Sequence, residues 1–160
     1  MPNNGIIHLS DASLIAVHAL AGLAAAPERL VQGKDLASSM GASENHLAKV
    51  MQRMVRAGIA RSVKGPAGGF GLARPASEIS FRQTIEAVDG PLTGDFCPFR
   101  TETCDPSNCI FGRDISMWAA ELLAYLGKRT IDDIAKEKLS RTAPPYAGST
   151  SRRKGRRAGS

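Results

Sequence analysis

The chain has 160 residues, of which 42% are hydrophobic and 22% charged, and a formal net charge of +6, a composition typical of a folded globular protein. No apolar run approaches the roughly 18–20 residues of a membrane-spanning helix, and the N-terminus lacks the basic segment of a secretory signal, so we predict a cytoplasmic protein without membrane association. Three cysteines fit poorly with a secreted disulfide framework, because pairing two leaves one over, and clustered thiols in a reducing compartment are typical of metal-binding or redox-active sites.

The first 58 residues predict three helices. Residues 10–26 predict a helix that ends before Pro27, with apolar residues at helical spacing at Leu14, Val17, Leu20 and Ala24. A short helix over 33–40 closes at Gly41. A third helix opens at Ser43 and ends at Gly58, and its apolar stripe consists of Leu47, Val50, Met51, Met54 and Val55. Two helices joined by a short glycine turn, the second capped by serine, are typical of a helix-turn-helix.

A change of period follows the third helix. Apolar and polar residues alternate over 59–63, which indicates a half-buried strand. The glycine-rich residues 65–69 predict a turn, and residues 70–73 predict a returning strand. The glycine segment lacks the Gly-Lys-Ser/Thr ending of a phosphate-binding loop and opens no helix, so we expect no nucleotide site there. A hairpin directly after a helix-turn-helix is the wing of a winged-helix domain.

The rest of the chain predicts three further helices, a loop and a tail. A helix from about residue 80 ends at 90–91, a polar loop over 92–108 follows, and a last short helix covers 131–139. Between them, the longest helix runs over 110–128, with Ile115, Ala119, Leu122, Leu123 and Leu126 on one side and Trp118 and Tyr125 beside them. The predicted fold is mainly α with a small β wing: a winged helix-turn-helix domain (1–91), a cysteine loop (92–109), a long C-terminal dimerisation helix with a final helix (110–139), and a disordered basic tail (140–160).

The charges are distributed unevenly along the chain. Between Lys49 and Arg74 there are six basic residues and no acid, whereas residues 83–122 contain seven acids and two arginines. Residues 141–160 hold six further basic residues and no acid. A concentrated basic segment is the pattern expected of a face that binds a polyanion.

The third helix and the hairpin together predict a surface that binds DNA. A recognition helix offers short polar side chains to base edges and positive charge to phosphates. This requirement is met by Ser43, Asn45, His46, Lys49 and Arg53. On the hairpin, Arg61 and Lys64 supply cations, while Gly65 and Gly68 let the backbone approach a groove closely. A purely structural helix would explain the helix alone but not the basic hairpin beside it.

The three cysteines, Cys97, Cys104 and Cys109, lie among turn-forming residues that let one short loop gather the sulfur atoms around one centre. Neither interval is the two-residue spacing common in zinc sites. Iron–sulfur clusters tolerate more varied thiolate spacing but normally have four protein ligands. Spacing alone therefore leaves four possibilities: an iron–sulfur cluster, a labile zinc site, a thiol–disulfide switch that uses two of the three, and unconnected thiols.

Four segments resemble the IscR/NsrR-type family of winged helix-turn-helix iron–sulfur transcriptional regulators: SENHLAKVMQRMVRAGIARSVKGPAGGF, SEISFRQTIEAVDG, the cysteine loop and TIDDIA. The resemblance covers about residues 7–139. It implies a homodimer that binds a palindromic operator, with the long helix crossing between protomers and with DNA contacts from the recognition helix and Lys64. It also implies that Cys97, Cys104 and Cys109 hold a [2Fe–2S] or [4Fe–4S] cluster whose state controls DNA binding.

The chain departs from the family pattern around the cluster. Its cysteines are less equally spaced than in sensing members, and Gly112 and Leu14 stand where some relatives have a histidine or aspartate as fourth ligand. His18 stands where one relative uses a histidine to bind the cluster of the other protomer. No enzyme is predicted, because His8, His18 and His46 fall on different elements without a placeable nucleophile. The predicted function is a DNA-binding repressor that senses iron, nitric oxide or redox state; the alternative is a cluster-free regulator with a zinc site or thiol–disulfide switch.

Overall fold

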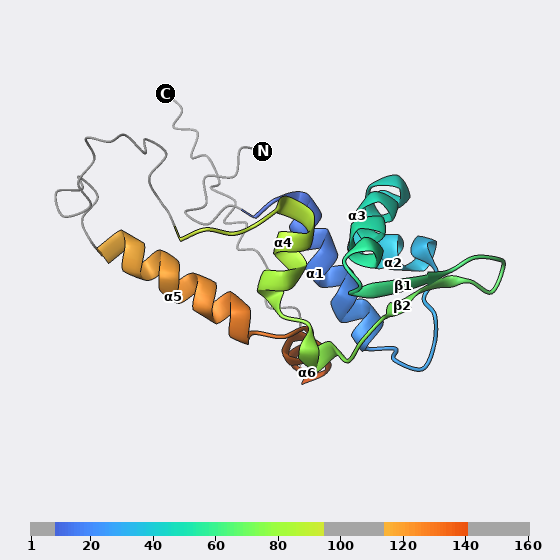
Figure 1. Ribbon diagram of the computed structural model, residues 1–160. Helices are drawn as coiled ribbons and strands as arrows, with labels where there is room; N and C mark the ends of the chain where they lie inside the picture. The colour runs from blue at the N-terminus through green and yellow to red at the C-terminus, as the bar shows by residue number, and fades with distance from the viewer. Residues whose placement is uncertain (1–8, 95–113, 141–160) are drawn as a thin grey trace, which may run out of the picture.

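The structure, a computed structural model, describes residues 9–94 and 114–140. Its elements are α1 (Asp11–Ala24), α2 (Gly33–Met40), α3 (Glu44–Arg56), β1 (Ala60–Val63), β2 (Gly69–Leu72), the 3-10 helix η1 (Ala76–Glu78), α4 (Phe81–Asp89), α5 (Asp114–Lys128) and α6 (Ile131–Ser140). The mainly helical fold with one two-stranded sheet is confirmed (Figure 1). Among the described elements, η1 alone was not predicted from the sequence. No helix in these two ranges combines the length and apolar character needed to cross a membrane.

Serine caps determine where three of the helices begin. Ser10, Ser43 and Ser80 each accept a hydrogen bond from the backbone nitrogen three residues later, at 3.0, 3.2 and 3.2 Å. Ser80 completes a capping box, because the Gln83 side chain accepts from the Ser80 nitrogen at 3.2 Å. The turn between α2 and α3 requires positive φ at Gly41 (64°), which glycine adopts without a steric penalty. The predicted helix starts at Ser43 and Ser80 are therefore confirmed.

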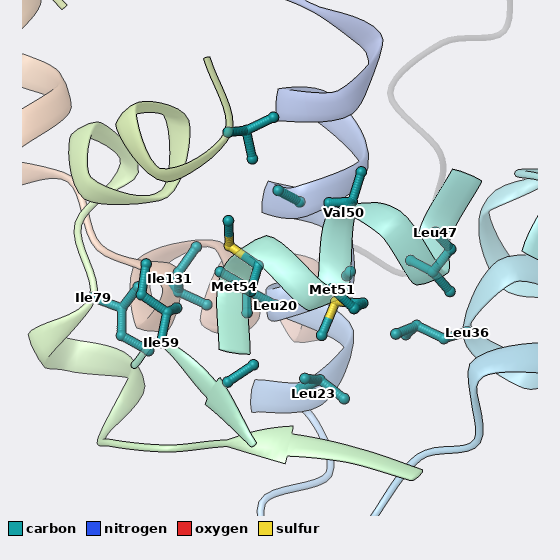
Figure 2. Packing of buried hydrophobic residues seen from close by; sticks show 14 of the residues in the cluster. Leu20, Leu23, Leu36, Leu47, Val50, Met51, Met54, Ile59, Ile79 and Ile131 are labelled. Atoms are coloured by element: carbon teal, nitrogen blue, oxygen red, sulfur yellow. The ribbon is translucent and has the colours of Figure 1, made fainter. Parts of the chain in front are cut away.

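One hydrophobic core joins helices from both ends of the described chain. α1 packs against α3, α4 and α6. The core combines Leu20 and Leu23 of α1, Met51 and Met54 of α3 and Ile131 of α6 (Figure 2). Because the apolar stripe of α3 lies in this core, as predicted, the opposite side of α3 faces outward.

The predicted inward face of α1 is wrong at one position. Leu14 is 42% exposed, whereas Ser13 and Ala16 are fully buried. Apolar residues occur on almost every side of α1, so its periodicity does not identify the buried face. Small residues such as Ala16 and Ala19 share that face with Leu20 and Leu23, and they let neighbouring helices approach closely.

The wing is attached to the chain that precedes α2. β1 and β2 pair as an antiparallel hairpin. Val31 pairs with Phe70 through two backbone hydrogen bonds of 2.9 and 2.8 Å. Near the tip, the Gln32 amide donates to the Pro66 carbonyl oxygen at 3.3 Å. These contacts hold the wing against the helix-turn-helix.

Gly69→Ala is expected to destabilise the fold, because this attachment leaves no room for a side chain. A Cβ at Gly69, where φ is +156°, would lie 2.5 Å from the Val31 carbonyl oxygen. We expect the free energy of unfolding, measured by urea titration, to fall by about 1–3 kcal/mol.

The matched control is Gly127→Ala in α5, where an added Cβ meets nothing within 4 Å. Alanine is the better helix former, so this change should raise the free energy of unfolding by up to about 1 kcal/mol. Equal effects of the two substitutions would contradict the close approach of Val31 and Gly69.

Candidate nucleic-acid interface

The outer side of α3 presents polar and basic side chains. Asn45 and Lys49 are exposed and lie one turn apart, and residues at this spacing are neighbours on a helix surface. Gln52 and Arg56 are also exposed and continue the same row at helical spacing. Gln52 was not predicted from the sequence, although its spacing of three residues from Lys49 places it on the same side of the helix. The row lies opposite the buried stripe, so all four side chains can reach a partner together.

The first turn of α3 is fixed by its cap and borders a groove. The Ser43 hydroxyl oxygen accepts from the His46 backbone nitrogen at 3.2 Å, so this predicted DNA contact also starts the helix. Both residues line a groove of about 940 Å³ that runs between the start of α3 and α1. His18, predicted as a cluster ligand, is exposed on α1 and lines the same groove.

On the wing, the two predicted basic residues have different settings. The Arg61 Nε donates to the Leu72 carbonyl oxygen at 3.2 Å, and its guanidinium lies over Gly71, where a Cβ would come within 3.2 Å of Nε. The side chain of Arg61 is thus held along the hairpin. Lys64 is exposed at the start of the turn. The hairpin therefore offers one oriented guanidinium and one exposed ammonium group.

The two predicted wing glycines shape the turn. Gly65 has a φ of 110°, and its carbonyl oxygen accepts from the Gly68 nitrogen at 2.9 Å. A Cβ at Gly68 would lie 2.2 Å from the Val63 carbonyl oxygen. Both positions therefore require glycine for the fold itself, but only Gly65 is exposed, and Gly68, predicted to let DNA approach, is buried.

The start of α3 and Phe70 of the wing lie next to each other. A hollow of about 210 Å³ is lined by Gly33, Lys34, Glu44, Asn45, Leu47, Ala48 and Phe70. Phe70 of the wing packs close to Gly33, where a Cβ would come within 3.3 Å of its ring. The predicted helix and the predicted hairpin thus form one surface, which also includes Lys34. Lys34 was not predicted from the sequence, because it lies near α3 and the wing only through the long-range pairing of Val31 with Phe70.

Arg53, also predicted to contact DNA, has a partner in its own chain. Its Nη1 donates to the Val88 carbonyl oxygen of α4 at 2.7 Å.

Nearby on α4, the Arg82 Nε donates to the Glu86 carboxylate at 2.9 Å, and the Leu92 nitrogen donates to the same oxygen at 3.2 Å. The hydrogen bond from Arg82 lowers the pKa of Glu86 below its ordinary value. The second half of α4 therefore holds both α3 and the chain that leaves α4.

The predicted metal-binding cysteines, Cys97, Cys104 and Cys109, lie outside the described residues, as does the predicted basic tail over 141–160. Within residues 9–94 and 114–140, no three histidine, cysteine, aspartate or glutamate side chains are arranged to hold a metal ion. Of the four predicted ligands, only His18 is therefore placed.

α5 extends away from the body formed by the other helices (Figure 1). It exposes large apolar side chains. Met117, Trp118 and Tyr125 are 57%, 64% and 55% exposed. Leu126, from the predicted apolar stripe, is instead buried within the chain. The stripe thus packs partly against the chain itself, and the aromatic side of α5 lies open.

Sequence comparison finds regulators along most of the chain. A family model, Rrf2, described as an iron-dependent transcriptional regulator, matches residues 9–137. BadM of Rhodopseudomonas palustris, named as an HTH-type transcriptional regulator, is 40% identical over 79 residues, which cover 49% of this chain and about half (51%) of that relative. A protein of Aquifex aeolicus, also named as an HTH-type transcriptional regulator, is 35% identical over 128 residues, covering 78% of this chain and 89% of the relative.

Two solved structures are similar in fold. CymR, the global cysteine regulator of B. subtilis, has a TM-score of 0.73 at 20% identity, covering 82% of this chain and 98% of that chain. T. potens IscR has a TM-score of 0.67 at 23% identity, covering 87% of this chain and 94% of that chain. At these identities the likeness concerns the fold alone.

Proposed function

The chain belongs to the Rrf2 family of transcriptional regulators, which are DNA-binding proteins and not enzymes, and from this premise we propose that it is a homodimeric, cytoplasmic repressor whose operator binding is controlled by an iron–sulfur cluster. The observation that carries the proposal is the exposed polar row of α3 beside a basic hairpin with a glycine turn. The major groove of B-DNA admits one α-helix, and a row of this kind can read base edges there.

In this proposal, α3 enters the major groove with its N-terminal half. Asn45 contacts base edges, for which its amide is suited to adenine, and Lys49 contacts guanine or phosphate. Ser43 and His46 lie at the end of the helix that meets the DNA first. The wing contacts the adjacent DNA backbone through Arg61 and Lys64, and exposed Gly65 lets the chain approach a groove closely. Gly68, predicted for the same role, is buried and shapes the turn instead.

A second copy of the chain is the proposed partner of α5. Exposed Met117, Trp118 and Tyr125 would be costly to leave in water, and a twofold arrangement would bury them against the same surface of the other protomer. Two recognition helices related by a twofold axis match a palindromic operator whose half-sites are one helical turn apart.

The proposed cofactor is a [2Fe–2S] or [4Fe–4S] cluster held by Cys97, Cys104 and Cys109. Three thiols within one short polar loop form a donor set that such clusters accept, and a fourth ligand is needed. His18, exposed on α1, is the candidate for this role, supplied to the cluster of the other protomer. The family's description as iron-dependent supports the proposal. The resemblance in fold to a cysteine regulator supports the alternative, a cluster-free thiol switch.

Asn45→Ala tests the base-reading role of α3. The operator is first obtained by enriching random duplexes on the wild-type protein. We expect the variant to lose about 1–3 kcal/mol of binding free energy on the operator and less on random DNA, because only the operator offers the matching base edge. Fluorescence anisotropy on both duplexes measures this difference, and Ser38→Ala, at an exposed position of α2, serves as the control. Equal losses on both duplexes would contradict base reading by Asn45.

A further inference from the structure

The last turn of α4 forms polar bonds to two other helices. On one side, the Arg53 Nη1 of α3 donates to the Val88 carbonyl oxygen at 2.7 Å. On the other side, the two carboxylate oxygens of Asp89 accept from the hydroxyl groups of Ser10 and Ser13 at the start of α1, both at 2.7 Å. Successive residues of α4 thus bind the recognition helix and α1.

The bond from Arg53 has a physical basis in the helix end. The last four carbonyl groups of an α-helix have no partner within the helix, and they carry a partial negative charge. Val88 is the next-to-last residue of α4 and therefore presents such a carbonyl. A guanidinium forms a strong, directional bond there. Arg53 therefore has a reason to dock on α4 that is independent of DNA.

The bonds from Asp89 are equally specific. Ser10 is the N-cap of α1, and Ser13 is fully buried, so its hydroxyl group depends on a protein partner. A carboxylate at the start of a helix is also stabilised by the partial positive charge of that end. Asp89 thus fixes the start of α1 to the end of α4.

We propose that Arg53 and Asp89 are positioning residues that hold the recognition helix at the angle needed to enter the major groove. This role rests on the proposed DNA-binding function and adds the contacts that set the angle of α3 relative to the DNA. The apolar stripe of α3 packs against the core without strong directionality, whereas a hydrogen bond near its C-terminal end resists tilting. Arg53 then acts through α4 and not through a phosphate group.

The test compares Arg53→Gln with Lys64→Gln, the proposed phosphate contact. Each phosphate contact contributes about 0.9 to the slope of log affinity against log salt concentration. We expect Arg53→Gln to lower operator affinity about three- to tenfold with an unchanged salt slope and little loss on random DNA. Lys64→Gln should reduce the slope by about one and weaken both duplexes.

Two results would overturn the role of Arg53: a slope reduced by about one with parallel losses on both duplexes, or an operator affinity equal to that of the wild type. Thermal unfolding of each variant separates misfolding from misalignment. If the wild type itself showed no preference for any DNA sequence, the proposed function would fail first. If the wild type and Lys64→Gln behave as expected, an unexpected result for Arg53→Gln contradicts only the positioning role of Arg53.

Asp89→Asn gives a second test, because the loss of a negative charge and the misalignment of the recognition helix change operator affinity in opposite directions. Loss of a negative charge by itself strengthens binding to a polyanion, so both duplexes would bind more tightly. Misalignment predicts instead that operator affinity falls about threefold or more. Ser13→Ala removes a partner of Asp89 without a change of charge and should act in the same direction. Unchanged ratios of operator to random affinity in both variants would remove Asp89 from the proposal.

Discussion

Replacing Trp118 and Tyr125 together by glutamate is expected to convert the proposed dimer into monomers and to weaken operator binding at least about a hundredfold. Both side chains are more than half exposed on α5, so the change should leave the protomer folded. Burying two carboxylates in an apolar interface is strongly unfavourable. A monomer reaches only one half-site, and the binding energy of the second half-site is then lost.

Sedimentation or light scattering at micromolar concentration gives the oligomeric state, and the same samples give operator affinity. Ser116→Glu is the matched control, because Ser116 is exposed on α5 but is not three or four residues from Met117, Trp118 or Tyr125 and so does not share their face. Leu126 is unsuitable for this test, since it is buried within the chain and its replacement would destabilise the protomer. A wild-type monomer that binds the operator tightly would contradict the dimer.

Cys104→Ala is expected to abolish the visible absorption of anaerobically purified protein and to change operator affinity while the winged helix stays folded. Ligating thiolates must be deprotonated and brought together, so the binding energy of a cluster orders the loop that carries them. That loop lies in sequence between α4, which holds the recognition helix through Arg53, and α5. A change in the loop can therefore alter the alignment of the two recognition helices.

Ser107→Ala, in the same segment of sequence, is the control and should retain the absorption of the wild type. If protein lacking all three cysteines kept the wild-type spectrum, the cysteines would not hold the cluster. If loss of the cluster left operator affinity unchanged, the cluster would not be the sensor. A colourless wild type whose affinity depends on thiol oxidation or on zinc would favour the alternative of a cluster-free switch.

Local signals were enough to predict most of the fold. Ser43 and Ser80 marked helix starts, Gly41 marked the turn, and alternation followed by glycines marked the wing; the structure confirms each of these. The family resemblance is confirmed as well. Leu14 was misplaced because α1 is apolar nearly all round, which removes the contrast that periodicity needs.

Contacts between distant residues could not be predicted in the same way. The bond of Arg53 to Val88 spans 35 positions, and that of Asp89 to Ser13 spans 76. On sequence alone, Arg53 is simply another cation of a basic segment. Only its distance to the end of α4 indicates a structural partner, and the DNA-contact role predicted for it is tested by the salt dependence of binding.

Enrichment of random duplexes on the wild type and on Asn45→Ala tests whether α3 reads DNA sequence as one half of a dimer. We expect the wild type to select two inverted half-sites about one helical turn apart. Asn45→Ala should select the same spacing with relaxed preference at one position in each half-site. If the wild type selected no common sequence, or if both proteins selected sequences with identical preferences, α3 would not read DNA through Asn45 in this way.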